Sequence, residues 1–136
     1  IASDHAGFKL KENIKDFLVN KNISIIDLGP INENSVDYPD YAKKVSNRVK
    51  SKISDVGILV CGSGTGMAIS ANKMKKIRAA VCYNSRSTRL SRQHNNANII
   101  ALGSRLTKKN TALKLVSIFL ETKFEGGRHQ RRVKKI

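Results

Sequence analysis

The 136-residue sequence contains no tryptophan, and its four Phe and three Tyr make up only 5% of the chain. A core must therefore be built from Ile, Leu, Val and Ala, and at this length it can bury about two thirds of the unfolded surface. No apolar run approaches the roughly 20 residues of a bilayer span, and no secretory leader is visible, so we expect a soluble cytoplasmic protein without a membrane partner. Two cysteines are too few for a disulfide framework, so both are expected to be reduced thiols.

Carboxylates are absent from a long central stretch. Residues 56–120 hold eleven Lys and Arg but no Asp or Glu, and the net charge of the whole chain is +16. This distribution favours an anionic partner, either a small phosphate or a polyanion. Nucleic-acid binding is one interpretation of the charge, although so few aromatic residues offer little surface for stacking bases. Scattered residues such as Lys43, Lys44 and Lys50 are typical of a solvated face.

Short apolar segments alternate with segments of helical period. Strands are predicted at residues 1–3, 23–28, 56–60, 78–82 and 98–102, and apolar stripes at helical spacing run through residues 10–18, 38–49 and 112–120. This order predicts one α/β domain over residues 1–136, with a five-stranded parallel sheet and helices on both faces. Because the first strand is so short, we expect residues to precede Ile1. The basic, Gly-led segment 125–132 is expected to form a C-terminal arm or short helix.

A glycine-rich loop follows the third predicted strand, where parallel sheets bind their ligands. Glycine occupies every second position of Cys61-Gly62-Ser63-Gly64-Thr65-Gly66. Glycines permit close backbone approach, and amides at a helix start bind negative charge, so the loop predicts an anion cradle; a tight turn alone would need only one glycine. The spacing fits neither a dinucleotide fingerprint nor a P-loop. A phosphatase-type loop would require an Arg to close the cradle, and residue 67 is Met.

The two cysteines differ in what surrounds them. Cys61 stands at the mouth of the glycine loop, where a thiolate is favoured and can act as a base or as a nucleophile. Cys82 is followed by no glycine loop and is interpreted as a structural thiol. The histidines and cysteines are scattered without zinc-site spacing, so we expect no metal and no cofactor.

Seven short motifs together resemble one enzyme family along the whole chain. They are Ser3-Asp4-His5-Ala6-Gly7, Asp37-Tyr38-Pro39, the Cys61–Gly66 loop, Ala71-Asn72-Lys73, Ser91-Arg92-Gln93-His94-Asn95, Gly103-Ser104-Arg105 and Glu125-Gly126-Gly127-Arg128-His129. The sequence is similar to the type B ribose-5-phosphate isomerases, a family that includes galactose- and allose-6-phosphate isomerases. The resemblance implies a Rossmann-like sheet and a homodimer or tetramer whose metal-free active sites draw residues from two chains.

The resemblance also implies roles in catalysis. Cys61 resembles the base, His94 the acid that opens the sugar ring, and Asp4 a group that contacts the sugar oxygens. Ser63, where many members have Thr, supplies a hydroxyl beside the thiol. Amides of the loop, from the substrate-binding residues Gly62, Gly64, Thr65 and Gly66, would hold the oxyanion that develops in the reaction.

Substrate capture is assigned in the same way. Arg105, Arg128 and Arg132 resemble the phosphate-binding residues, with His5 close by, and the planar guanidinium suits phosphate oxygens. Asn95 resembles a contact to a sugar hydroxyl. Tyr38 is expected either to line the pocket or to pack in the core. Arg131 and His129 are further candidates for phosphate capture.

These roles imply a metal-independent isomerase that interconverts ribose 5-phosphate and ribulose 5-phosphate through a cis-enediolate, in the non-oxidative pentose phosphate pathway. An isomerase of allose or galactose 6-phosphate is the alternative within the family. Two other interpretations are a nucleic-acid-binding protein and a sugar-phosphate-binding protein without turnover.

Overall fold

The computed structural model describes all 136 residues, and the chain forms four strands and six helices joined by loops. In chain order these are β1 (Ala2–Ser3), α1 (Phe8–Asn20), α2 (Tyr38–Lys50), β2 (Gly57–Cys61), α3 (Thr65–Asn72), β3 (Ala79–Val81), α4 (Ser85–Gln93), β4 (Ile99–Gly103), α5 (Lys109–Glu121) and α6 (Gly127–Val133). The sheet has the order β1-β2-β4-β3, and every neighbouring pair is parallel. None of the helices combines the length and the apolar character needed to cross a bilayer.

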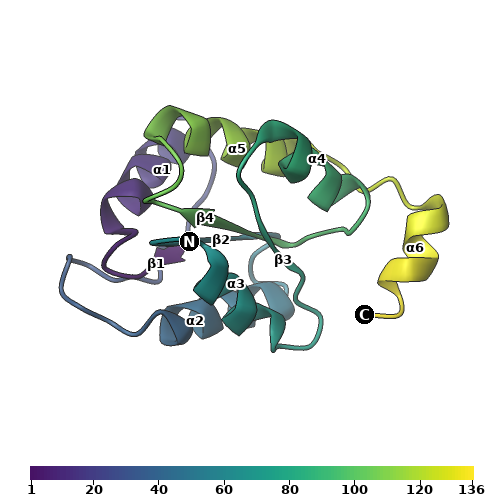
Figure 1. The fold of residues 1–136 in the computed structure, drawn as a ribbon, viewed down its shortest axis with the longest axis horizontal. Helices are drawn as coiled ribbons and strands as arrows, with labels where there is room; N and C mark the ends of the chain where they lie inside the picture. The colour runs from purple at the N-terminus through teal and green to yellow at the C-terminus, as the bar shows by residue number, and fades with distance from the viewer.

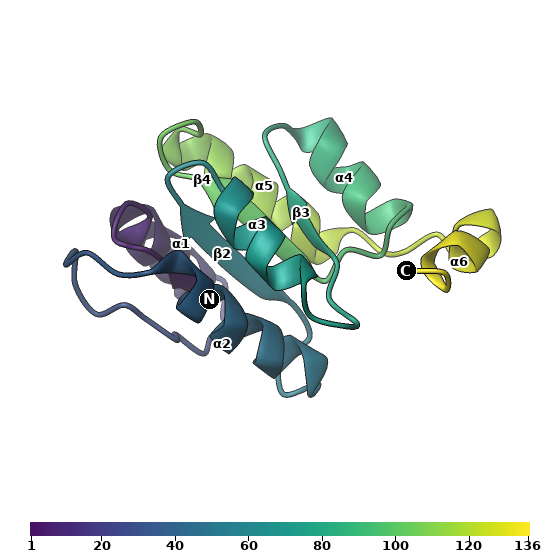
Figure 2. The same ribbon diagram turned by 60° about the horizontal axis from the view of Figure 1, so that its bottom comes forward.

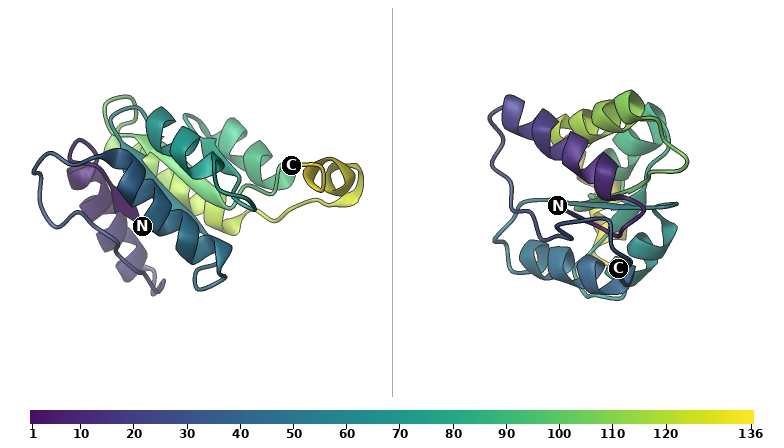
Figure 3. Two further views of the ribbon diagram at one scale, coloured as in Figure 1. Left: turned by 90° about the horizontal axis from the view of Figure 1, so that it is seen from below. Right: turned by 90° about the vertical axis from the view of Figure 1, so that its left-hand side faces the viewer.

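Helices cover both faces of the sheet, as predicted. Figure 1 and the right-hand view of Figure 3 show α1, α4 and α5 on one side and α2 and α3 on the other. Side chains of a strand point alternately to its two faces, so β2 serves two cores. Ile58 and Val60 pack with α1 and α5, whereas Leu59 and Cys61 pack with α2 and α3. The sulfur that the sequence singles out therefore lies on the α3 side of the sheet.

The prediction of a fifth strand at residues 23–28 is wrong, because this segment forms no regular ladder. It runs beside β1 and makes a single parallel pair of bonds, in which the Ile1 amino group donates to Ile26 and the Leu28 N–H donates to Ile1. The next bond, from the Ser3 N–H, goes to Gly29, whose φ of +96° turns the chain. Ladder pairing stops there because the register is lost.

The other elements match the sequence pattern closely. The three apolar stripes form α1, α2 and α5, and the basic segment forms α6, which projects from the body of the molecule (Figure 1). Helix α4 has no apolar stripe, and Thr88 is its only buried residue. It begins where the Asn84 side chain accepts the Ser87 N–H at 2.8 Å, a common helix start.

An ion pair between the buried Lys11 and Asp27, whose side chain is 27% exposed, fixes the irregular segment after α1. Lys11 is fully buried, and its ammonium group donates to both oxygens of Asp27, at 3.1 and 2.9 Å, and to the Pro30 carbonyl at 2.8 Å. Burial alone would raise the pKa of Asp27, but hydrogen bonds from Lys15, Lys11 and the Gly29 amide lower that pKa to about 2. The segment is thereby attached to α1 by charge rather than by a ladder.

We expect Lys11→Met to lower the free energy of unfolding by about 3 kcal/mol, since it leaves the Pro30 carbonyl and part of the Asp27 carboxylate without a donor. Lys9→Met is the matched control on the same helix, because the Lys9 side chain is 78% exposed and its ion pair with Glu33 lies on the surface. The control should change stability by less than about 1 kcal/mol. Urea unfolding of both variants at neutral pH measures the difference, and equal losses would contradict a special role for Lys11.

Candidate active site

A cleft of about 370 Å³ opens at the carboxyl edge of the sheet. It collects residues from the ends of three strands, including Asp4 and His5 after β1, Cys61, Gly62 and Ser63 at the end of β2, and Arg105 after β4. These residues are far apart in the sequence and meet because parallel strands place their carboxyl ends together. Figure 2 shows this edge, where the loop from β2 turns into α3.

A larger cavity, of about 610 Å³, lies between the segment 27–31 and α2. Lys44 and Arg48 line it, but it has no thiol, no histidine and no glycine-rich loop at a helix start. The smaller cleft, which contains Cys61 and the glycine-rich loop, is therefore the candidate active site.

The Cys61 thiol is buried and lines the cleft, and the Gly64 N–H donates to its sulfur at 3.1 Å. An amide donor stabilises negative charge on sulfur, as the interpretation of Cys61 as a thiolate base requires. No hydrogen bond joins Ser63 to the thiol. The Ser63 hydroxyl instead accepts the Thr65 N–H at 3.3 Å, so it holds the loop rather than the sulfur.

The loop amides divide into two groups. Those of Gly64 and Thr65 are occupied within the loop, and neither of these residues lines the cleft. Gly62, Ser63 and Gly66 do line it, and their N–H groups have no acceptor within the chain. The expected oxyanion cradle is thus available from Gly62, Ser63 and Gly66, whereas Gly64 and Thr65 shape it.

Two glycines let neighbouring strand ends approach closely enough to form this cradle. Gly64 has a φ of +82°, and a Cβ at Gly103 would lie 2.7 Å from the Ser63 carbonyl. Arg105, two residues beyond Gly103, lies over the loop, since a Cβ at Gly62 would come within 3.3 Å of its Cζ. Although residue 67 of the loop is Met, a guanidinium group therefore lies over the loop from the end of the adjacent strand β4.

Asp4 and His5 each have one atom held by the backbone. Asp4 is 8% exposed, and its Oδ1 accepts the Gly7 N–H at 2.8 Å, so the carboxylate both shapes the turn and keeps one oxygen for a ligand. The Val36 N–H donates to Nδ1 of His5 at 3.4 Å. In the neutral imidazole this bond leaves the proton on Nε2, where it can be donated to an anion.

Tyr38 lines the cleft rather than packing in the core. Its side chain is 42% exposed, and its ring lies against Gly66, where a Cβ would meet ring atoms at 3.0 Å. Sequence reasoning missed Leu106, a 63% exposed side chain on the same wall. Its only signal is its position next to Arg105 after a strand.

Four predicted site residues lie at the other end of the molecule. His94 and Asn95 follow α4, which runs back along the sheet and ends before β4 begins, at the amino edge. Arg128 and Arg132 are exposed on α6, which projects beyond α4 (Figure 2). The five residues of β4 alone span about 17 Å. One chain therefore brings together Asp4, His5, Cys61 and Arg105 but not His94, Asn95, Arg128 or Arg132.

A cluster at this second end has the composition of a metal site. His94, Glu125 and His129 place one ligand atom each within 4.8 Å of one another. The two imidazole rings are stacked with an interplanar angle of 7°, so their lone pairs point along parallel planes and do not converge on one ion. Arg128 donates to His129 and adds a positive charge that opposes a cation. The cluster is therefore a poor metal site, and its carboxylate lies near the imidazole nitrogens.

Comparison with known proteins shows the family of this chain. The family described as Ribose/Galactose Isomerase matches residues 1–136. Ribose-5-phosphate isomerase B of Escherichia coli is 45% identical over 133 residues, which cover 98% of this chain and 89% of the relative. The chain belongs to the ribose/galactose isomerase family.

Solved structures of similar proteins agree closely with this one. A ribose 5-phosphate isomerase from Thermotoga maritima has a TM-score of 0.97 at 52% identity, covering 98% of this chain and 92% of that one. Ribose-5-phosphate isomerase B from Mycoplasma genitalium, solved with bound ribulose-5-phosphate, has a TM-score of 0.94 at 44% identity, covering 98% and 90%. The resemblance seen in the seven motifs is thereby confirmed at the level of the family.

Proposed function

We propose that this protein interconverts D-ribose 5-phosphate and D-ribulose 5-phosphate, as a cytoplasmic enzyme of the non-oxidative pentose phosphate pathway. The observation that carries the proposal is the Cys61 sulfur, which lies in a cleft beside unpaired amides and Arg105. Several relatives named ribose-5-phosphate isomerase B, one of them with bound ribulose-5-phosphate, support the pentose over a hexose phosphate. Both cysteines are free thiols, which suits a reducing compartment.

The chemistry follows from the atoms in the cleft. The Cys61 thiolate removes the proton from C2 of the open-chain aldose and returns it to C1. Negative charge then develops on the sugar oxygens, where the amides of Gly62, Ser63 and Gly66 can stabilise it, and a preorganised donor of this kind contributes about 3–4 kcal/mol. Asp4 lines the same cleft with one free oxygen, which would move a proton between the two hydroxyl oxygens of the enediol.

Ring opening and phosphate capture require the second group of residues. An imidazole such as His94 can give a proton to the ring oxygen and take one from the anomeric hydroxyl, so opening leaves its own protonation unchanged. Arg128 and Arg132 provide guanidinium groups for phosphate beside Arg105 and His5, and Asn95 provides an amide for a sugar hydroxyl. Because these residues lie at the opposite edge from Cys61, a second copy of the chain must bring them to the cleft.

We therefore infer a homodimer, or a tetramer built from such dimers, with shared active sites. The projection of α6 from the body supports this arrangement (Figure 3). The edge strand β3 is only partly buried, and Ile69 and Tyr83 beside it are 59% and 48% exposed. An apolar edge of this kind provides a surface for a second copy.

Substrate choice is tested by parallel turnover assays on ribose 5-phosphate, allose 6-phosphate and galactose 6-phosphate. We expect the pentose to give the highest kcat/KM, and turnover to persist in the presence of a chelator. A higher kcat/KM on either hexose phosphate would replace the pentose assignment. Binding of ribose 5-phosphate without turnover would identify a sugar-phosphate-binding protein instead.

Cys61→Ala is expected to lower kcat by about 10²- to 10⁴-fold, the usual effect of removing a positioned base. Cys82→Ala is the matched control, because Cys82 is buried beneath α4 and does not line the cleft. Burial raises the pKa of the Cys82 thiol, and this effect outweighs hydrogen bonds with Thr88 and Ser91 that lower the pKa. The control should keep its turnover even if its stability falls. Near-normal kcat in purified Cys61→Ala would exclude the sulfur as the base.

Shared sites predict complementation between two inactive variants. Cys61→Ala damages the cleft of its own chain, and His94→Asn damages the residues that a chain lends to its partner. A mixed dimer has one site with both groups intact, so co-refolding the two variants should restore up to about half of the wild-type activity per mixed dimer. If the mixture stays as inactive as its components although mixed dimers form, both groups must act within one chain.

A further inference from the structure

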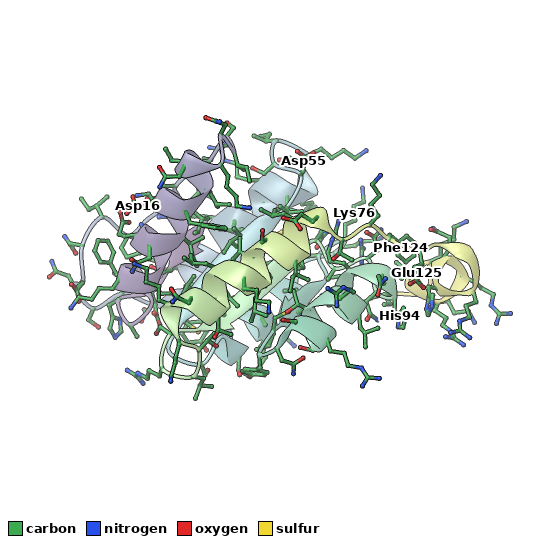
Figure 4. The ribbon with its side chains drawn as sticks, turned by 90° about the horizontal axis from the view of Figure 1, so that it is seen from above. Asp16, Asp55, Lys76, His94, Phe124 and Glu125 are labelled. Atoms are coloured by element: carbon green, nitrogen blue, oxygen red, sulfur yellow. The ribbon has the colours of Figure 1, made fainter.

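The junction between α4 and α6 holds His94 in an organised setting. Its imidazole ring stacks on that of His129, with centroids 4.1 Å apart and an interplanar angle of 7°. Oε2 of Glu125 lies 3.7 Å from Nε2 of His94 and 3.8 Å from Nε2 of His129. Figure 4 shows His94 and Glu125 close together where α4 meets the segment that leads into α6.

The two imidazoles do not share the carboxylate equally. His129 is buried, and burial, His94 and Arg128 lower its pKa. The Arg128 Nε–H also donates to Nε2 of His129 at 3.4 Å, which requires a lone pair on that nitrogen. Nε2 of His129 is therefore engaged by Arg128, and the His129 ring forms a flat surface on which the His94 ring stacks.

Backbone hydrogen bonds fix the position of Glu125 relative to His94. The Glu125 N–H donates to the Gln93 carbonyl at 3.1 Å, directly before His94. Arg92 bridges the same junction, because its guanidinium donates to the carbonyls of Thr122 and Ala97. The other charged groups at the junction are Arg78, which donates to the carbonyls of Asn95 and Asn96, and Arg128 and Arg132 on α6. Glu125 is the one carboxylate within 4 Å of the His94 ring nitrogens.

We propose that Glu125 is a positioning residue for His94: its carboxylate, 3.7 Å from Nε2 of His94, helps to orient an imidazole ring that stacks on His129. The inference rests on the proposed function in one respect, the assignment of His94 as the ring-opening acid. An imidazole whose ring is already oriented transfers a proton more readily, because the reaction does not have to wait for the ring to turn. Glu125 does not line the cleft, and its carboxylate forms no ion pair with Arg128 or Arg132. Its replacement is therefore expected to change kcat rather than KM.

The test is a double-mutant cycle between Glu125→Gln and His94→Asn in the full-length enzyme, with ribose 5-phosphate as substrate. Glu125→Gln alone should lower kcat on the order of tenfold and leave KM within about twofold, while His94→Asn alone should cost about 10²-fold or more. In the His94→Asn background, Glu125→Gln should cause no further loss, because its route to the reaction has been removed. Glu121→Gln is the matched control, since Glu121 is exposed and bonded only to Ser117 on its own helix.

A structural readout separates positioning from misfolding. The chain has only three histidines, so the His94 ring protons can be followed by NMR. They should shift in Glu125→Gln and not in Glu121→Gln, while the thermal unfolding midpoints of both variants stay close to that of the wild type.

Three results would overturn the inference. A raised KM with unchanged kcat in Glu125→Gln would mean that Glu125 only anchors the arginines of α6. A full additional loss in the His94→Asn background would mean that Glu125 acts independently of His94. An unchanged His94 spectrum would mean that the two groups are not coupled. Wild-type turnover in His94→Asn is a different result, which removes His94 from the proposed mechanism itself.

Discussion

Every strand of this sheet runs in the same direction, so all carboxyl ends lie at one edge and all amino ends at the other. Side chains that follow β1, β2 and β4 are thereby brought into one cleft, although up to about a hundred residues separate them in the chain. The same constraint sends His94 to the far edge, because a helix that leads back to the start of the next strand must end there. The cleft is rich in groups that handle negative charge and does not contain His94, the proposed ring-opening acid. In the proposed mechanism, the geometry of a parallel sheet is therefore the reason why a second copy of the chain completes the site.

Within the cleft, close packing of backbones matters as much as the functional side chains. The β2–α3 loop lies against β4 at Gly103, with no room for a Cβ. This contact brings Arg105 over Gly62, and the amides of the cleft-lining residues Gly62, Ser63 and Gly66 have no partner within the chain. Amides without a partner are costly where they are shielded from water, and they remain available to a ligand that reaches them. Their retention at the mouth of a thiol site is what a stabiliser of transient negative charge requires.

Much of this could be predicted from the sequence because the signals are local. The apolar period gave α1, α2 and α5, and the position of the Cys61–Gly66 loop after a buried strand placed the cleft. Residues 23–28 have the composition of a strand, yet pairing depends on a register with β1 that composition does not encode. The separation of Gly64 and Thr65 from the cleft was equally hidden, since alternate glycines look alike until the direction of each amide is known. The contact of Glu125 with His94 joins two segments 31 positions apart and has no local signal.

The high net charge becomes easier to interpret once the residues are placed. The arginines assigned to phosphate lie in two groups, with Arg105 at the cleft and Arg128 and Arg132 on α6, so a single chain does not crowd them together. Bringing these groups to one site opposes like charges, and a bound phosphate relieves that repulsion through bidentate contacts. In the proposed dimer, affinity for the anion and the approach of the second chain would therefore be linked through the same guanidinium groups. A neutral ligand cannot provide this relief, so under the proposed function the basic composition would favour phosphorylated sugars.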